Sequence, residues 1–179
     1  MLRTLSIVAV IALAISAVLA CGQASTQPQD VGARAVAALV GPDGSGMGVV
    51  TLTQTHHGVL IAAEVEGLSP GGHGFHIHTV GTCSPDFAAA GDHFNPGDVG
   101  HGYNNPAGVH AGDLPNIYAN ADGAARADYF TAAVTLDVDV DHSLFDADGS
   151  AIIIHENPDT YGEDAGAGGR VACGVITRY

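Results

Sequence analysis

Short apolar runs separated by clusters of glycine, proline and aspartate fill most of the chain after residue 30. β-branched and other apolar residues dominate these runs, and their apolar positions do not repeat with a helical period. Runs of this length and composition between turn residues predict β-strands, and several in succession indicate an antiparallel sandwich or barrel. The expected strands are residues 33–40, 47–55, 59–65, 74–80, 125–135, 151–155 and 170–177.

Two segments lack this strand pattern. Residues 81–122 are rich in glycine, asparagine, proline and aspartate, and residues 157–169 are rich in glycine. The first is far longer than loops of about 12–15 residues, which are already uncommon inside compact domains and are usually functional. Binding and catalytic residues concentrate on loops that a rigid scaffold holds in place. We therefore expect the chemistry of this protein on these two loops of a β scaffold.

The N-terminal 20 residues have a different pattern. One arginine, Arg3, precedes an apolar run over residues 7–20 that only Ser16 interrupts. This arrangement is typical of a secretory signal peptide, and the run is too short for a membrane span of about 20 residues. We therefore expect residues 1–20 to be removed on export.

The end of this leader resembles a bacterial lipobox. Residues 18–22 read V-L-A-C-G, so that a small residue immediately precedes Cys21. Such a motif implies cleavage before Cys21 and lipidation of that cysteine. An ordinary cleavage site beside a chance cysteine is the alternative, but it leaves an exported free thiol unexplained. The polar residues that follow predict a flexible tether over residues 21–32, and residues 33–179 have a length typical of one domain.

Cysteine number and charge add two constraints. With Cys21 assigned to a lipid, Cys83 and Cys173 remain as an even pair, which in an exported protein is most simply a disulfide. Acidic residues number 19 against five arginines and no lysine, for a formal net charge of −14. Because no basic patch exists to neutralise phosphates, the composition excludes nucleic acid as a partner.

A pattern of histidines indicates metal binding. It consists of His76, His78, His93, His101, His110 and His155. His76 and His78 are two apart in a predicted strand, so their side chains point to the same face. Clustered imidazoles are costly if buried and charged, whereas a divalent cation requires them neutral. Four nitrogens suit copper; three nitrogens with a carboxylate oxygen, such as that of Asp113, suit tetrahedral zinc.

Five motifs follow one another along the domain. They are G-F-H-I-H at residues 74–78, H-F-N-P at 93–96, H-x7-H-x8-H-x2-D over 93–113, S-A-I-I-I-H-E at 150–156 and G-G-R-V-A-C-G-V-I at 168–176. Together, and in this order, they resemble the copper/zinc superoxide dismutase family, specifically its bacterial exported branch. The resemblance covers residues 36–176. It implies an all-β fold: an eight-stranded antiparallel Greek-key barrel or sandwich with two long functional loops.

The resemblance implies two metal sites that share one residue. The copper ligands would be His76, His78, His93 and His155. The zinc ligands would be His93, His101, His110 and Asp113. His93 would therefore bridge the two ions as an imidazolate and would also act as the proton carrier.

Other residues gain roles from the same resemblance. Asp159 matches a carboxylate that accepts hydrogen bonds from one copper ligand and one zinc ligand, here His76 and His101. Arg170 matches the arginine that attracts and orients the superoxide anion beside copper. The cysteine pair matches the family disulfide, which anchors the long loop to the barrel. His73 is expected to serve the barrel structure instead.

The function that the resemblance implies is dismutation of superoxide to oxygen and hydrogen peroxide by a redox-cycling copper ion beside a structural zinc ion. The alternative is a copper- and zinc-binding lipoprotein on the same scaffold, without turnover. A zinc hydrolase is remote because no open zinc position is apparent. We expect an extracytoplasmic protein, in the periplasm or at the cell surface, anchored to the membrane through Cys21. The family's bacterial members include monomers and homodimers, and the sequence does not decide between them.

One segment departs from the family pattern. The loop of residues 156–169 is shorter than in most members, has four carboxylates and contains no lysine. Arg170, at its end, is the only cation nearby in the sequence. Because negative charges oppose the approach of an anion, we expect weaker electrostatic steering of superoxide than a cationic loop would give.

Overall fold

The computed structural model describes residues 30–179; the predicted leader, its cleavage site and Cys21 lie outside the described residues. The strands are β1 (Arg34–Val40), β2 (Gly46–Thr55), β3 (Gly58–Val65), β4 (Gly71–His78), β5 (Asp113–Ala119), β6 (Ala125–Thr131), β7 (Ala151–His155), β8 (Arg170–Val175) and β9 (Thr177–Arg178). A single 3-10 turn, η1 (Phe87–Ala90), lies in the long loop after β4. The sequence predicts that the strand beginning at residue 125 ends at residue 135, but β6 ends at Thr131. No helix over residues 30–179 is long and apolar enough to cross a membrane.

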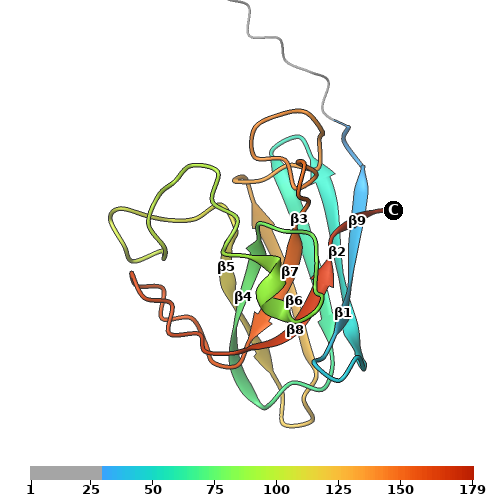
Figure 1. Ribbon diagram of the computed structural model, residues 1–179, viewed down its shortest axis with the longest axis vertical. Coiled ribbons are helices and arrows are strands. Elements are labelled where there is room, and N and C mark those ends of the chain that lie inside the picture. Colours follow the sequence, from blue (N-terminus) through green and yellow to red (C-terminus); the bar gives the residue numbers. More distant parts are fainter. Residues whose placement is uncertain (1–29) are drawn as a thin grey trace, which may run out of the picture.

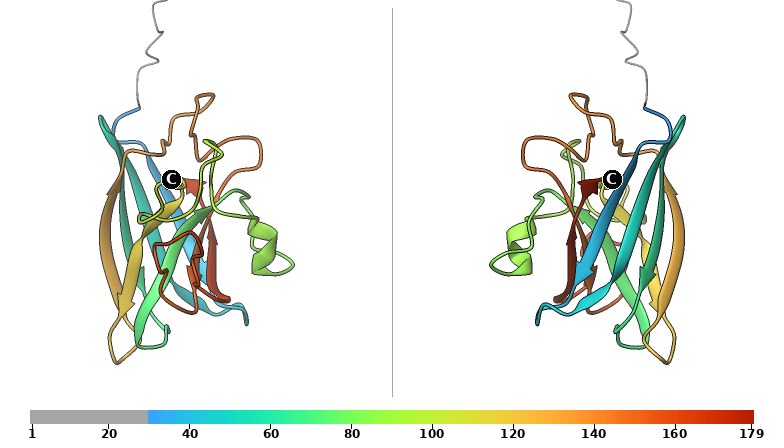
Figure 2. Two further views of the ribbon diagram at one scale, coloured as in Figure 1. Left: turned by 90° about the vertical axis from the view of Figure 1, so that its left-hand side faces the viewer. Right: turned by 90° about the vertical axis from the view of Figure 1, so that its right-hand side faces the viewer.

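Antiparallel pairing closes the sheet into a barrel (Figures 1 and 2). The strand order is β2-β3-β6-β5-β4-β7-β8-β1-β9, and β1 also pairs with β2, so that β1 to β8 form a closed ring. β9 is two residues long and pairs with β1. Neither β3 and β4 nor β6 and β7 are neighbours, since the chain crosses the barrel there in the Greek-key manner. The predicted eight-stranded antiparallel Greek-key barrel is confirmed.

Alternation of apolar and polar residues decides which face of a strand is buried. In β3 every second residue from Val59 to Val65 is buried, and the residues between them are exposed. The largest side chains of the core are Leu39, Leu52, Ile61, Phe75, Ile77, Leu114, Ile117, Leu136, Leu144, Ile152 and Ile154. β4 from His73 onward and the whole of β7 are instead buried on both faces. Both strands therefore have a covering layer on the outside of the barrel.

The expectation that residues 81–122 lack strands is wrong, because β5 lies within them at Asp113–Ala119. Proline is unfavourable in a central strand, and Pro115 hid this one from sequence reasoning. Leu114 and Ile117 nevertheless fill the core. β5 pairs with β4 along much of its length but with β6 at one residue pair only. A strand that is largely unpaired on one side tolerates proline, which explains the exception.

A disulfide and an arginine fasten the long loop to the barrel. Cys83, early in the loop, is bonded to Cys173 of β8, 90 residues later, which confirms the predicted pair. Arg170, the first residue of β8, donates from Nη1 to the Phe87 carbonyl at 2.6 Å and from Nη2 to the Gly91 carbonyl at 2.7 Å. The loop on both sides of η1 is therefore tied to one strand.

Removing the disulfide is expected to lower the free energy of unfolding by about 2–5 kcal/mol, because closing so long a loop restricts the unfolded chain. The measurement is urea unfolding of the double variant Cys83→Ala/Cys173→Ala beside the wild type. Wild-type protein unfolded with a thiol reductant serves as the control and should shift in the same direction. Unchanged unfolding free energies in both samples would contradict the prediction.

Candidate metal centre

Strand β4 sends two histidines out of the barrel. Phe75 and Ile77 point into the core, so the alternation of the strand turns His76 and His78 toward the outer face. The centroids of these two rings lie 6.3 Å apart. His155, the last residue of the neighbouring strand β7, adds a third ring, 4.9 Å from that of His76 and 5.7 Å from that of His78. Two paired strands therefore present three imidazoles on one surface.

Backbone hydrogen bonds bring the long loop onto β4 beside these rings. The Ile77 N–H donates to the Gly112 carbonyl at 2.9 Å, and the Ile77 carbonyl accepts from the Phe94 N–H at 2.8 Å. The Gly112 N–H in turn donates to the Phe94 carbonyl at 2.8 Å. Any side chain at Gly112 would collide with the Ile77 carbonyl oxygen, so this close approach requires glycine. As a result, the ring centroid of His93 lies 4.0 Å from that of His76.

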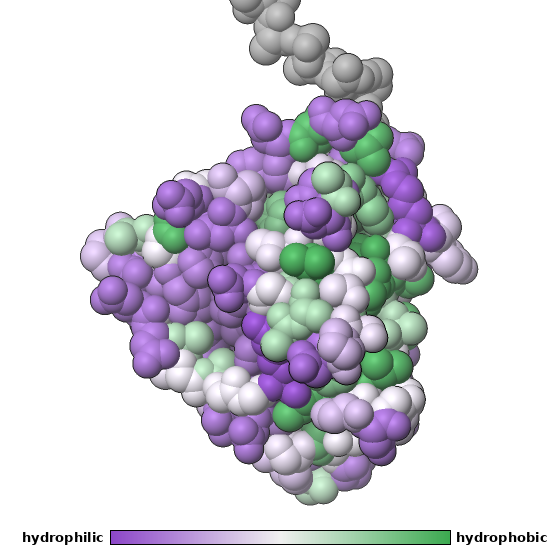
Figure 3. Space-filling view, in the orientation of Figure 1, coloured by the Kyte–Doolittle hydropathy of each residue, from purple (hydrophilic) through white to green (hydrophobic). Residues whose placement is uncertain are grey.

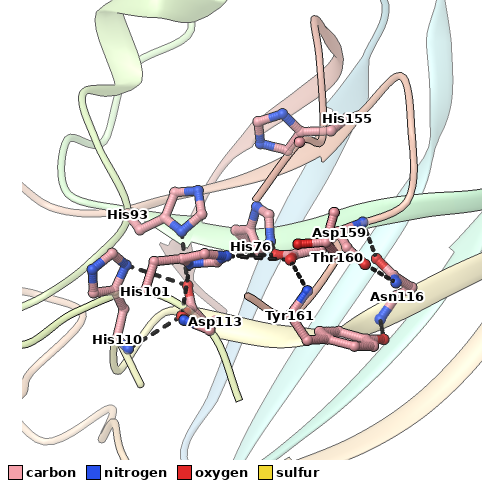
Figure 4. A network of polar contacts seen from close by, with 12 residues as sticks. His76, His93, His101, His110, Asp113, Asn116, His155, Asp159, Thr160 and Tyr161 are labelled. Carbon is pink, nitrogen blue, oxygen red and sulfur yellow. Dashed lines mark hydrogen bonds and ion pairs between the residues drawn. The ribbon is translucent and has the colours of Figure 1, made fainter. Parts of the chain in front are cut away.

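Strands and loop together form two groups of metal-ligating side chains that share His93 (Figure 4). The first group is His76, His78, His93 and His155. The second group is His93, His101, His110 and Asp113. Within each group the candidate ligand atoms lie within 4.8 Å of one another, close enough for one cation to reach all of them. The structure thus brings together the residues that the sequence predicts as ligands.

Several ring nitrogens in these groups are buried without a hydrogen-bond partner. They are His76 Nδ1, His78 Nε2, His155 Nε2, His101 Nδ1 and His110 Nδ1. Among the described residues, the Ser150 hydroxyl is the other buried side-chain atom in this condition. A buried polar atom without a partner costs about 1–3 kcal/mol, so such atoms gathered around two small spaces point to a ligand. One metal ion in each group would satisfy them, and the residues therefore fit a pair of metal ions.

In His76, His101 and His78 the opposite ring nitrogen is held by an acceptor. His76 Nε2 lies 2.7 Å from Asp159 Oδ2, and His101 Nε2 lies 3.2 Å from Asp159 Oδ1. His78 Nδ1 donates to the Gly91 carbonyl at 2.8 Å. Because each partner accepts, the held nitrogen carries the proton and the free nitrogen presents its lone pair. Asp159 also connects the two groups, since it contacts one ring from each.

Asp113 organises the second group. Its Oδ1 accepts from His93 Nδ1 at 2.7 Å, and its Oδ2 accepts from the backbone N–H groups of Gly102 and His110, both at 3.1 Å. His101 Nδ1 lies 2.9 Å from Oδ2 but lacks the alignment of a hydrogen bond. Burial alone would raise the pKa of Asp113, but the hydrogen bonds from His93 and Gly102 outweigh it and hold that pKa well below its usual value. The carboxylate is therefore ionised at neutral pH.

Burial keeps three imidazoles of the first group, those of His76, His78 and His155, neutral. Desolvation lowers the pKa of His78 to about 2 and that of His155 to about 4. It also lowers the pKa of His76, although the hydrogen bond to Asp159 acts in the opposite direction. Metal ions bind the neutral imidazole, so these rings have no proton to lose before they bind one at neutral pH.

Arg170 places a positive charge beside the first group. The Gly91 carbonyl accepts both from Arg170 Nη2, at 2.7 Å, and from His78 Nδ1, at 2.8 Å, so one oxygen joins the guanidinium to the ring. Arg170 also lines an open pocket of about 650 Å³, together with Pro85 and Phe87 of the long loop. A small anion that enters this pocket meets the guanidinium.

Acidic residues surround the approach to the second group. A pocket of about 500 Å³ is lined by the three histidines of that group together with Asp92, Glu163 and Asp164. Hydrophilic residues gather on the side of the molecule where the two long loops lie (Figure 3). The carboxylates that line this pocket attract cations and repel anions.

His73, predicted to be structural, lies behind the first group. It is buried; its Nδ1 lies 2.7 Å from the His155 carbonyl, and its Nε2 lies 2.8 Å from the Ser69 carbonyl. The ring therefore ties the end of β7 to the segment before β4. It contributes no atom to either group of ligands.

Sequence reasoning missed residues that support the site from behind. The Asn116 side chain hydrogen-bonds to the backbone of Asp159, and the Tyr103 hydroxyl donates to the Asp113 carbonyl at 2.6 Å. Neither residue type has a spacing that marks such a role, and both contacts join segments that only the fold brings together.

Known proteins resemble this chain over most of its length. Residues 47–176 match the family model for copper/zinc superoxide dismutase. A "Superoxide dismutase [Cu-Zn]" of Caulobacter vibrioides is 46% identical over 147 residues, which cover 79% of this chain and 84% of that protein. A "Superoxide dismutase [Cu-Zn] 2" of Aquifex aeolicus is 44% identical over 147 residues, which cover 80% of this chain and 86% of that protein.

A solved structure extends the likeness to three dimensions. The crystal structure of a SOD-like protein from Bacillus subtilis matches with a TM-score of 0.76 and 37% sequence identity, covering 79% of this chain and 97% of that one. The barrel, the two groups of ligands and these similarities agree with one another. The chain belongs to the copper/zinc superoxide dismutase family, whose cofactors are copper and zinc.

Proposed function

We propose that this protein dismutates superoxide with copper in the first group of ligands and zinc in the second. The proposed copper ligands are His76, His78, His93 and His155. The proposed zinc ligands are His93, His101, His110 and Asp113. The observation that carries the assignment is the set of buried ring nitrogens without a partner, gathered around two spaces with His93 between them.

Bound copper would supply a centre that takes an electron from one superoxide and gives it to a second, so that oxygen and, with two protons, hydrogen peroxide are formed. His93 Nδ1 is engaged with Asp113 on the zinc side, which leaves its Nε2 for the copper side. That nitrogen is therefore the atom available to hold a proton and deliver it to the product. Asp159 fixes the orientation of His76 and His101 from behind.

Arg170 is the proposed anion-binding residue. Two backbone carbonyls, those of Phe87 and Gly91, hold its guanidinium at the edge of the open pocket. Because its side chain is fixed before superoxide arrives, ordering it costs little when the anion binds. Its positive charge favours the anion beside the proposed copper ligands, because the Gly91 carbonyl joins the guanidinium to His78.

The non-catalytic alternative is not favoured. A metal-storage protein needs neither an imidazole shared between two groups nor a cation aimed at the first, and this chain has both in His93 and Arg170. A zinc hydrolase is also disfavoured, because the second group already offers four protein ligands and leaves no open position for water.

A disulfide and bacterial relatives fit an extracytoplasmic location, since disulfides persist in oxidising compartments. We further propose that residues 1–20 are a lipoprotein signal peptide, that residues 21–32 are a lipidated Cys21 with its tether, and that residues 33–179 are the catalytic domain. The motif V-L-A-C-G at residues 18–22 supports this division. Mass spectrometry of the N-terminal peptide from a membrane fraction should find lipid on Cys21; an unmodified peptide would refute the anchor.

Replacing Arg170 by alanine is expected to lower kcat/KM for superoxide at least about tenfold, because a fixed charge beside the site raises the rate of anion capture. The assay is superoxide consumption by the copper- and zinc-loaded protein, with metal content measured on the same samples.

The matched control is Arg126→Ala. Arg126 is an exposed arginine of β6 that contacts Glu64 at 3.3 Å and lies in neither group of ligands. The Arg126→Ala substitution removes the same charge from the chain and should leave kcat/KM nearly unchanged. If both variants lost the same fraction of activity at full metal content, Arg170 would have no local role.

Added salt is expected to leave kcat/KM nearly constant or to raise it slightly. The protein has a formal net charge of −14, and carboxylates line the pocket beside the second group, so screening weakens repulsion at least as much as attraction. The measurement is the rate between ionic strengths of about 0.01 M and 0.15 M, over which the Debye length shortens from about 30 Å to about 8 Å. A steep decline with salt would show instead that attraction dominates the approach.

A further inference from the structure

Asn116 is a buried polar residue on β5 whose side chain grips the backbone of another segment. Its Nδ2 donates to the Asp159 carbonyl at 2.9 Å, and its Oδ1 accepts from the Asp159 N–H at 2.8 Å. The primary amide is well suited to this task, because it offers a donor and an acceptor side by side. A residue 43 positions away in sequence is thereby fixed at both its N–H and its carbonyl.

The Asp159 carboxylate faces away from Asn116 and toward the metal ligands (Figure 4). One oxygen accepts from His76 Nε2 at 2.7 Å; the other accepts from His101 Nε2 at 3.2 Å and from the Tyr161 N–H at 2.6 Å. His76 belongs to the first group of ligands and His101 to the second. The position of one carboxylate therefore decides where the free Nδ1 atoms of both rings point.

Two tyrosine hydroxyls hold Asn116 itself. The Asn116 N–H donates to the Tyr161 hydroxyl at 2.8 Å, and the Tyr129 hydroxyl donates to the Asn116 carbonyl at 2.7 Å. Pairing between β5 and β6 is confined to Ala119 and Ala125, so at Asn116 these hydroxyls take the place of a neighbouring strand. Without them, the N–H and carbonyl of a buried residue would lack partners on this side.

The conformation of Tyr161 indicates that this arrangement is firmly held. Its φ is +62°, a left-handed value that is uncommon for a bulky side chain and costs of order 1 kcal/mol or more. Such a backbone persists where the surroundings fix it. Here the Tyr161 carbonyl accepts from the Asn104 N–H at 2.7 Å, its N–H binds Asp159, and its ring lies 5.6 Å from that of Tyr103.

We propose that Asn116 is a positioning residue of the two metal sites. Held by Tyr129 and Tyr161, it fixes Asp159 so that the carboxylate aims His76 and His101 at their ions. The inference rests on the proposed function, because it takes these two histidines as a copper and a zinc ligand. Loss of the amide would free the Asp159 backbone. Mutation of residues that hydrogen-bond to metal-bound histidines typically lowers metal affinity by about 10–100-fold.

The test compares Asn116→Ala and Tyr161→Phe with Tyr118→Phe. The first variant removes the amide, and the second removes one hydroxyl that holds it. The third removes a hydroxyl from an exposed tyrosine on the same strand, β5, and is the matched control. Zinc dissociation constants are measured by competition with a chromophoric chelator, and absorption spectra are recorded with Co²⁺ in the zinc site. Both readings are taken well below each variant's thermal transition.

Zinc affinity is expected to fall about tenfold in Asn116→Ala, with an altered Co²⁺ spectrum. A smaller loss is expected in Tyr161→Phe and none in Tyr118→Phe. A purely structural role would lower thermal stability in the first two variants but leave zinc affinity and the Co²⁺ spectrum at their wild-type values; that result would overturn the inference. If Asn116→Ala does not fold, the Tyr161→Phe measurements decide in the same way.

His101→Ala separates the inference from the proposed function. The wild type should bind zinc far more tightly than this variant, which lacks a proposed zinc ligand. Wild-type protein that bound zinc no better than His101→Ala would refute the metal site itself, and the inference with it. Tight zinc binding by the wild type with unchanged affinity in Asn116→Ala would refute the positioning role alone.

Discussion

The three hydrogen bonds that join Ile77, Phe94 and Gly112 are the interaction on which the rest of the site depends. They press two distant parts of one long loop against the middle of β4, between the positions of His76 and His78. Together with the hydrogen bond from the Thr79 N–H to the Asp92 carbonyl, they fix His93 relative to the strand histidines, so that the two groups of ligands can share its ring. Gly112 makes the contact possible, since any side chain there would push the loop off the strand.

The same loop is also held near η1, by a disulfide and by side-chain hydrogen bonds. The Cys83–Cys173 bond and the two hydrogen bonds from Arg170 tie the region of η1 to β8. Because the Gly91 carbonyl accepts from both Arg170 and His78, the proposed anion-binding residue and a proposed copper ligand share one support. One carbonyl oxygen of the loop therefore orients both the guanidinium and the imidazole.

Much of the fold and of the ligand set could be predicted from the sequence, for identifiable reasons. Strand β3 alternates cleanly, so a local pattern predicts it; the ligands follow from the resemblance of five motifs to a known family. β5 escaped because Pro115 is atypical of strands and because the strand's one long pairing, with β4, is a tertiary contact. The roles of Asn116 and Tyr161 could not be predicted for a related reason: their hydrogen bonds join β5 to a loop 43 to 45 residues away. Such contacts leave no periodic trace in the chain.

Strand β4 carries core residues and proposed metal ligands on alternate positions, and this has a consequence for folding. A shift of one residue in its pairing would turn Phe75 and Ile77 outward and place His76 and His78 in the hydrophobic core. Only the correct alignment with β7 brings His155 level with the other rings. An ion that binds the assembled site therefore stabilises that alignment over every shifted one, by mass action. The proposed metal ions would thus also favour the correct strand register.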